Sequence, residues 1–231
     1  MSNDTLARLM HLMQFADSAL PVGGFSFSNT LESAIEMGVV CDESTLAELT
    51  REIVRQATST DGIAALNAFR AAKDGDYHSI IRCDKALNAR KANTEQRLMS
   101  QRMGRKLAEL IAEITDNDLL RRFYGDIASA RTSGTYAVTQ GVAFAICEIG
   151  ERELFSAVCY GAASMVLNAA LRTMRITHRQ TQRIIFELGD EIDVWYNEVA
   201  GLNIEQMHSF YPQIDILAAI HEKGTKRLFM N

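Results

Sequence analysis

Apolar residues recur at intervals of three and four along most of the chain, which is the spacing of one face of an α-helix. The first such face is formed by Leu6, Leu9, Met10 and Met13. A further helix is predicted to begin with a capping box formed by Thr45 and Glu48. A long helix is predicted over 94–114, with Leu98 and Ile114 among its inward-facing residues.

The second half of the chain continues this pattern. Steps of four, four and three residues join Val138, Val142, Ile146 and Ile149. We expect that helix to end at Gly150. The segment 155–171 is apolar nearly all round, which predicts a central helix packed on several sides. No segment alternates apolar and polar residues with period two. The pattern therefore predicts an all-α fold, a compact multi-helix bundle with little or no sheet, in a single domain over 1–231.

One segment, 16–28, interrupts the helical pattern. Pro21 fixes its own backbone and disfavours helix at the residue before it, whereas Gly23 and Gly24 adopt positive φ readily. The segment continues with Phe25, Ser26 and Ser28. It is predicted to be a shaped loop that either packs closely against a neighbour or partner, or forms an anion-binding nest. The loop contains no basic residue to hold a phosphate, which favours the packing or partner contact.

Composition excludes some classes of protein. The chain has 231 residues, two prolines and a formal net charge of −5, which argues against general binding to nucleic acid. Its four cysteines form no C-x-x-C pair, and none lies near enough to a histidine in the sequence to suggest a zinc site, which predicts buried or half-buried thiols in a reducing cytosol. No segment resembles a secretion signal, and no stretch of about 18 uncharged apolar residues predicts a membrane span. We therefore expect a cytoplasmic protein without membrane contacts.

No group of residues in the sequence forms a recognisable catalytic or metal centre. The five histidines lack metal-ligand spacing, and the serines of the loop lie outside G-x-S-x-G. The alternative to a binding protein is a helical enzyme that holds a small anionic ligand at the Gly-Gly-Phe-Ser loop.

Three further features predict contacts. If their segment stays helical, a stripe is formed by Arg172, Arg175, Arg179 and Arg183. Such a stripe is either a solvated face or a docking face for an acidic partner or phosphates. Ser100 and Gly104 stand four apart in the long helix, which predicts close packing there, within the chain or between subunits. The tail 221–231 ends in apolar residues that either fold back on the core or bind a partner.

Several motifs resemble one known family. Residues 12–28, followed by Leu31 and Glu32, resemble the N-terminal signature of the UreF family of urease accessory proteins. Later motifs match in the family's order at Arg97, Ser100, Arg102, Met103, Gly104, Gly134, Tyr136, Val138, Gly141, Asp215, Ile216, His221, Glu222, Arg227, Leu228 and Phe229. The chain departs from the family at Thr30, usually glycine, and at Thr135, often histidine. It also departs at 175–178, which replaces Pro-Leu-(Gly/Ser)-Gln ahead of a matching Gln182.

The resemblance implies an all-helical, dimeric, cytoplasmic adaptor that is not an enzyme and binds no cofactor tightly, because nickel is handled by the complex. It implies as partners a UreD/UreH-type accessory protein, a UreG-type GTPase and apo-urease. The partner-binding residues expected on this basis are Pro21, Gly23, Gly24, Phe25, Ser26, Ser28, Glu32, Arg102, Gly104, Arg179, Gln182, His221, Glu222, Arg227, Leu228 and Phe229. We expect the tail to meet the UreD-type partner and the arginine stripe to meet the GTPase.

Overall fold

The computed structural model describes residues 5–24, 27–28, 30–209, 211–223 and 229, and within these ranges it contains no β-sheet. The all-α prediction is confirmed. In chain order the helices are α1 (Thr5–Ala16), α2 (Leu31–Glu36), α3 (Glu43–Ala57), the π-helical turn η2 (Thr58–Gly62), α4 (Ile63–Lys73), α5 (Tyr77–Arg90), α6 (Thr94–Ile114), α7 (Asp118–Ala128), α8 (Tyr136–Ile146), α9 (Glu151–Thr173), α10 (His178–Gly189), α11 (Ile192–Val199), the 3₁₀ turn η3 (Ile204–Gln206) and α12 (Pro212–Lys223). The extent of a single domain over 1–231 stays a prediction.

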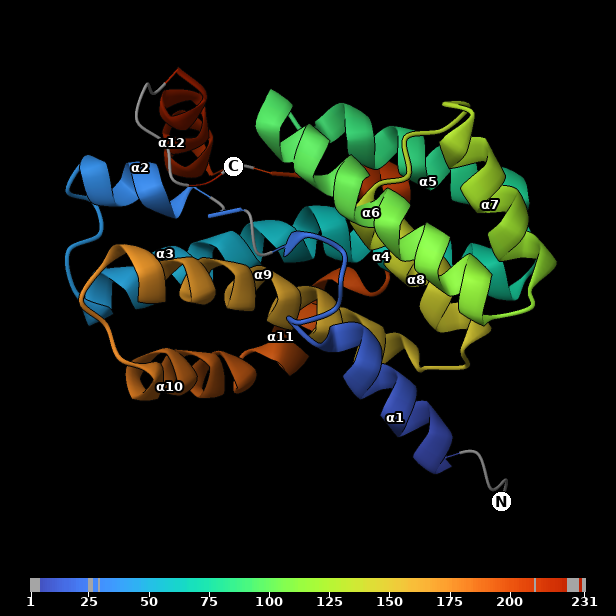
Figure 1. Cartoon of the computed structure of the whole chain (residues 1–231), viewed down its shortest axis with the longest axis horizontal. Helices are drawn as coiled ribbons and strands as arrows, with labels where there is room; N and C mark the ends of the chain where they lie inside the picture. Colours follow the sequence, from blue (N-terminus) through green and yellow to red (C-terminus); the bar gives the residue numbers. More distant parts are fainter. Residues whose placement is uncertain (1–4, 25–26, 29, 210, 224–228, 230–231) are drawn as a thin grey trace.

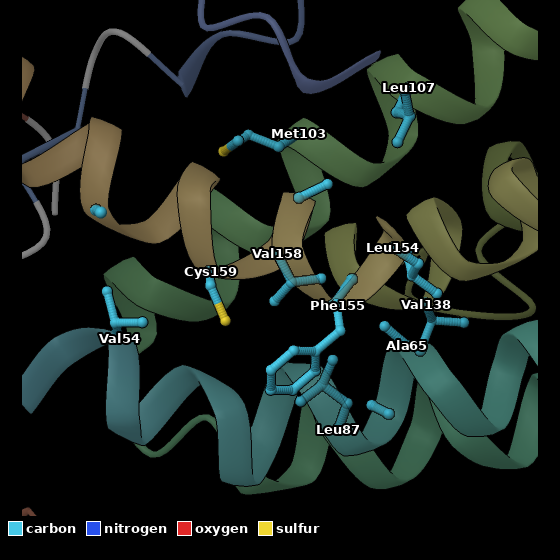
Figure 2. Packing of buried hydrophobic residues seen from close by; sticks show 14 of the residues in the cluster. Val54, Ala65, Leu87, Met103, Leu107, Val138, Leu154, Phe155, Val158 and Cys159 are labelled. Atoms are coloured by element: carbon cyan, nitrogen blue, oxygen red, sulfur yellow. The ribbon is translucent and has the colours of Figure 1, made fainter. Parts of the chain in front are cut away.

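Helix α9 lies at the centre of the arrangement, where it contacts α1, α3, α4, α8 and α10 (Figure 1). Helices α4 to α8 pack together on one side of the molecule, and α12 packs on α2 on the other. In Figure 2, Phe155 points from α9 toward Leu87 of α5, and its ring also lies against Gly62 in the π-helical turn. The predicted central helix is confirmed, and it begins four residues earlier than predicted.

Among the described helices, only α9 is long and apolar enough to cross a membrane. However, 61% of its most apolar window is buried inside the chain. Burial on several sides is typical of the core helix of a globular protein. We therefore assign the apolar character of α9 to its place in the core.

Helix α8 is buried along most of its length and makes a close contact with α4. A Cβ atom on Gly141 would stand 2.4 Å from the carbonyl oxygen of Ala65, so only glycine permits this approach. The predicted end of the helix was wrong. The chain leaves α8 after Ile146 through Glu148, whose φ is 55°, and Gly150 is instead the N-cap of α9.

A buried carboxylate fixes the connection that leads into α8. Asp84, in α5, is fully buried and accepts five hydrogen bonds. Its Oδ2 accepts from Thr132 Oγ1 (2.5 Å) and from the N–H groups of Ser133 (2.8 Å) and Gly134 (2.9 Å). Its Oδ1 accepts from the N–H and the Oγ1 of Thr135, each at 2.7 Å. Because five hydrogen bonds converge on one buried carboxyl group, this connection is held firmly.

The close contact predicted at Ser100 and Gly104 lies within the chain. A Cβ atom on Gly104 would stand 2.0 Å from the carbonyl oxygen of Gly134 and 2.8 Å from the Tyr136 nitrogen. One turn earlier, Ser100 Oγ accepts a hydrogen bond from the Tyr136 N–H at 3.1 Å. Helix α6 therefore presents its small residues to the start of α8. Gly104, named above as a partner-binding residue, is buried in this contact.

The range predicted for α6 is confirmed, but two of its predicted inward residues are exposed. Leu98 lies two residues before the buried Ser100, which is about 200° of helical turn. The two residues therefore lie on nearly opposite faces of α6, and Leu98 is on the exposed one. Ile114 is the last residue of the helix, where it gains no burial. The inward face of α6 combines the small residues that meet the start of α8 with the buried side chains of Met103, Leu107 and Ile111.

Two further predictions from local patterns were wrong. Helix α3 begins three residues earlier than predicted, because Asp42 is its N-cap and forms the capping box with Thr45. The four-arginine stripe does not form, because α9 ends at Thr173 and α10 begins only at His178. Thr177 forms a capping box with Gln180, which stabilises the start of α10 as a separate helix.

The cysteines are free thiols, and three of the four are at least partly buried, as predicted. Burial raises the pKa of Cys83 to about 11 and that of Cys159 to about 12, so both stay protonated and unreactive at neutral pH. Cys41 is the exception, since it is exposed.

We expect the Gly104→Ala substitution to lower the free energy of unfolding by about 3 kcal/mol, because the added methyl group meets backbone atoms that cannot move aside cheaply. Gly125→Ala in α7 is the matched control, because a Cβ atom there meets nothing within 4 Å; it should raise stability by about 0.5–1 kcal/mol. Urea unfolding of both variants measures the difference. Equal stabilities would contradict the packing described for α6.

Candidate partner-binding surfaces

The segment 16–28 is a shaped loop, as predicted. Asp17 accepts hydrogen bonds from the N–H groups of Ala19 (2.8 Å, at Oδ1) and Leu20 (3.0 Å, at the carbonyl oxygen). Gly23 has a φ of 86°, the region that favours glycine. The N–H groups of Ala19 and Leu20 are thus already used within the loop, which weakens the anion-nest interpretation. A packing or partner contact, the alternative favoured by the loop's lack of basic residues, therefore stays the prediction for this loop.

The expected contact residues of this loop differ in exposure. Pro21 and Gly23 are exposed, Gly24 is half-buried and Ser28 is fully buried. A Cβ atom on Gly24 would lie 3.2 Å from the Met103 methyl carbon, so Gly24 faces α6 rather than solvent. Phe25 and Ser26 lie outside the described residues. Among the described residues of the loop, Pro21 and Gly23 are therefore the expected contact residues that a partner can reach.

Just after the loop, Thr30 stands where the family usually has glycine. Its φ of 72° lies in the left-handed region, which costs a β-branched residue free energy that glycine avoids. Thr30 is fully buried, and its carbonyl oxygen accepts a hydrogen bond from Ser33 Oγ at 3.0 Å. The positive φ at position 30 therefore explains why the family usually has glycine there.

Residues from four parts of the chain meet around His221, which is buried in α12. Its Nε2 lies 3.1 Å from Glu32 Oε2 in α2, and its Nδ1 lies 2.9 Å from Glu95 Oε2 in α6. The same Glu32 oxygen accepts a hydrogen bond from the Phe229 N–H at 3.2 Å. The Arg172 guanidinium, from the end of α9, lies 4.2 Å from the centre of the Phe229 ring. We call these five residues the tail clamp.

The clamp holds the C-terminal segment against its own chain. Phe229 is buried, and Glu222 accepts a hydrogen bond from Asn93 Nδ2 at 2.8 Å. Of the two alternatives left open for the tail, the described residues favour folding back on the core. Arg227 and Leu228 lie outside the described residues. A role of the tail in partner binding stays a prediction. The buried clamp residues would serve it by fixing the position of α12 against α2.

Exposed apolar side chains gather on α1, which projects from the body of the molecule (Figure 1). The predicted helix is present, but its apolar face is not packed. Leu6 is 80% exposed and Met10 is 64% exposed, and Leu9 and Met13 are exposed beside them. A groove of about 460 Å³ runs beside α1, lined by residues that include Leu12, Phe155, Tyr160, Ile192 and Tyr196. Exposed apolar surface of this kind is typical of protein–protein contacts.

A second exposed surface lies on α10 and carries Arg179, Gln182 and Phe186, the last of which is 79% exposed. The positions are spaced three and four apart, so they share one face of the helix. The neighbouring Arg183 lies 3.4 Å from Glu43 of α3 in an ion pair. Arg179 makes no ion pair with any described residue. Arg102, on α6, is exposed elsewhere on the molecule.

The structure therefore brings together Glu32, His221 and Phe229, and it places Arg179 and Gln182 on a different face. Sequence reasoning missed Glu95 and Asn93, which sit where α6 begins and look like ordinary capping residues. Among the described residues, no three His, Cys, Asp or Glu side chains converge on a point where a metal ion could bind.

Comparison with known proteins gives the family. The UreF family model matches residues 40–189. Urease accessory protein UreF 2 of Brucella canis is 49% identical over 227 residues, which cover 98% of this chain and 93% of that protein. Urease accessory protein UreF of Yersinia enterocolitica serotype O:8 is 45% identical over 223 residues, 96% of this chain and 98% of that protein.

The chain belongs to the UreF family of urease accessory proteins. The resemblance seen in the motifs is confirmed, and it extends over nearly the whole chain. As a member of a family of accessory proteins, the chain is not an enzyme. The helical-enzyme alternative is thereby set aside.

We expect His221→Leu to loosen α12, because the carboxylates of Glu32 and Glu95 lose the imidazole that faces both of them. A loss of about 2 kcal/mol corresponds to amide exchange in α12 about thirty-fold faster than in the unchanged protein, measured by hydrogen–deuterium exchange. His208→Leu, at an exposed position, is the control and should leave α12 unchanged. Unaltered exchange of α12 in the His221 variant would contradict the clamp.

Proposed function

We propose that this UreF-family protein is a non-catalytic adaptor in the insertion of nickel into apo-urease. It binds a UreD/UreH-type accessory protein and recruits a UreG-type GTPase. A role in urease maturation follows from the family. The observation that carries the adaptor role is that large apolar side chains stay exposed on separate helices, among them α1 and α10, because one such face can join two copies of the chain while another binds a partner.

An adaptor works by position. Holding a nickel-carrying GTPase beside apo-urease raises the effective concentration of the metal donor at its acceptor without any new chemistry. If the adaptor binds one nucleotide state of the GTPase more tightly, it also shifts the population of that state. Nickel is cargo in this scheme, handled by the complex rather than held by this chain.

We assign the apolar face of α1 and its groove to a second copy of the chain. Long-lived subunit interfaces are more apolar than transient ones. In a two-fold dimer, the α1 face of each copy can lie in the groove of the other, since a two-fold interface uses the same patch on both subunits. The groove lies beside the same helix, since Leu12 and Ala16 of α1 line it, and this supports the arrangement.

The α10 face suits the GTPase. A GTPase binds and leaves during its cycle, and charged surfaces contribute more to fast, selective encounter than to permanent association. Arg179 offers a charge with no ion-pair partner among the described residues, and Phe186 adds an apolar anchor beside it.

The edge formed by α2 and α12 remains for the UreD-type partner. Met37 follows α2 and Ile216 lies on α12, and both are exposed. The tail clamp joins these two helices and keeps the edge in one shape. We infer a cytoplasmic location, which suits the free thiols, and no binding to nucleic acid or membrane.

We expect Met10→Asp to weaken self-association at least about tenfold, because the interface would bury a carboxylate without a partner. Sedimentation velocity measures the change as a shift from dimer to monomer. Met37→Asp is the matched control, because it places the same charge at an exposed methionine outside α1. If the Met10 variant sediments like the unchanged chain, the dimer does not use this face.

We expect a tagged copy of the chain to recover the GTPase and a urease subunit from lysate of its own cells. Arg179→Glu should reduce GTPase recovery about tenfold and leave urease recovery unchanged, because it reverses the charge of the α10 face. Arg105→Glu, at an exposed position on α6, is the control. If the Arg179 variant recovers as much GTPase as the unchanged chain, the α10 face is a solvent-exposed surface that does not bind the GTPase. If the unchanged chain recovers neither urease nor the GTPase, the adaptor role is overturned.

A further inference from the structure

The surface around α10 is basic, although the chain as a whole is acidic. The segment 172–186 carries four arginines and no aspartate or glutamate, whereas the chain has a formal net charge of −5. Arg179 and Arg183 lie on α10, Arg175 lies in the connection before it, and all three are exposed. A locally basic surface of this kind favours a partner whose own surface is acidic.

An acidic side chain from another helix reaches this basic surface. Glu43 stands in the first turn of α3, and α10 packs on α3 and on α9 (Figure 1). Its Oε2 accepts a hydrogen bond from Gln180 Nε2 at 2.7 Å. Its Oε1 lies 3.4 Å from Arg183 Nη1. One carboxylate therefore contacts two side chains of α10.

The two contacts of Glu43 differ in strength. Gln180 is itself fixed, because its Oε1 accepts a hydrogen bond from the Thr177 N–H at 2.8 Å, so the short bond to Gln180 holds the carboxylate in place. The contact with Arg183 is longer than the roughly 2.7–2.9 Å of a strong charge-assisted hydrogen bond, and the Arg183 side chain is 62% exposed. Exposed ion pairs contribute little free energy, so Arg183 can exchange this carboxylate for another at small cost.

We propose that Glu43 competes with an acidic partner for Arg183. This inference rests on the proposed binding of the GTPase to the α10 face, and it adds that the GTPase meets this face with carboxylates, one of which pairs with Arg183. A guanidinium group can bind a carboxylate through two parallel hydrogen bonds, which its present contact with Glu43 does not provide. A well-placed carboxylate of the partner therefore displaces Glu43 from Arg183.

This competition makes binding weaker but more selective. Arg179 and Arg183 stand four residues apart on α10, so a released Arg183 extends the charged part of the α10 face next to Arg179. Glu43 keeps its bond to Gln180 and stays nearby as a negative charge. A partner with a poorly placed carboxylate is repelled by Glu43 without gaining the full pair with Arg183, whereas a well-placed one gains it.

The test is a calorimetric titration of the full chain with the purified GTPase of the same organism. Glu43→Gln keeps an acceptor for Gln180 and removes the charge that holds Arg183, so it should bind the GTPase about threefold more tightly than the unchanged chain. Arg183→Gln should bind at least about threefold more weakly. Adding Glu43→Gln to the Arg183→Gln variant should change nothing further, because no guanidinium remains to be released.

Glu48→Gln is the matched control, because it removes the same charge from an exposed position of α3, and it should bind like the unchanged chain. Unchanged or weaker binding by the Glu43→Gln variant overturns the proposal, and so does an equal gain from Glu43→Gln with and without Arg183. If Glu43→Gln does not fold, Glu43→Ala takes its place with the same expectation.

The Arg179→Glu variant separates this inference from the proposed function. If Arg179→Glu weakens binding and Glu43→Gln does not strengthen it, the α10 face binds the GTPase and only the competition for Arg183 is wrong. If neither variant changes binding, the GTPase does not use the α10 face, and both proposals are overturned.

Discussion

The buried carboxylate of Asp84 is the constraint on which the arrangement of the helices depends. It gathers the N–H groups of three successive residues and two threonine hydroxyls, and so fixes the point where α8 begins. That point lies against Gly104 of α6 with no space for a side chain. Farther along α8, Gly141 lies equally close to α4. Helices α4, α5, α6 and α8 therefore have one register, set by backbone contact.

This packing leaves α9 in the centre, and the surfaces available to other proteins lie around it. An interface that is already in its binding conformation avoids the entropy cost of ordering itself when a partner arrives. At the edge of α2 and α12, which we propose for the UreD-type partner, the tail clamp fixes the shape in this way, since His221 joins the two helices to the start of α6. Capping boxes at the starts of α3 and α10 have a similar effect, because they fix where each helix begins.

Sequence reasoning predicted those elements that depend on local signals. The range of α6, the presence of the central helix α9, the loop around Pro21 and the family itself all follow from periodicity, turn residues or motifs. The start of α3 was wrong because two overlapping capping signals compete, and Asp42 is the one used. The arginine stripe was wrong because spacing alone does not show where a helix ends. The exposure of α1 could not be predicted, since an amphipathic helix has the same pattern whether it packs on its own chain or on another. The clamp was missed because Glu95 and His221 are distant in the sequence.

The central proposal is that α1 presents an apolar face that a second copy of the chain covers in the urease-maturation assembly. Hydroxyl-radical footprinting tests it directly, because methionine oxidation reports the exposure of single side chains. Met10 and Met13 should oxidise readily in the dilute chain and about tenfold more slowly in the assembly, while the buried Met103 oxidises slowly in both. Equal oxidation of Met10 and Met13 in the two states would contradict this account.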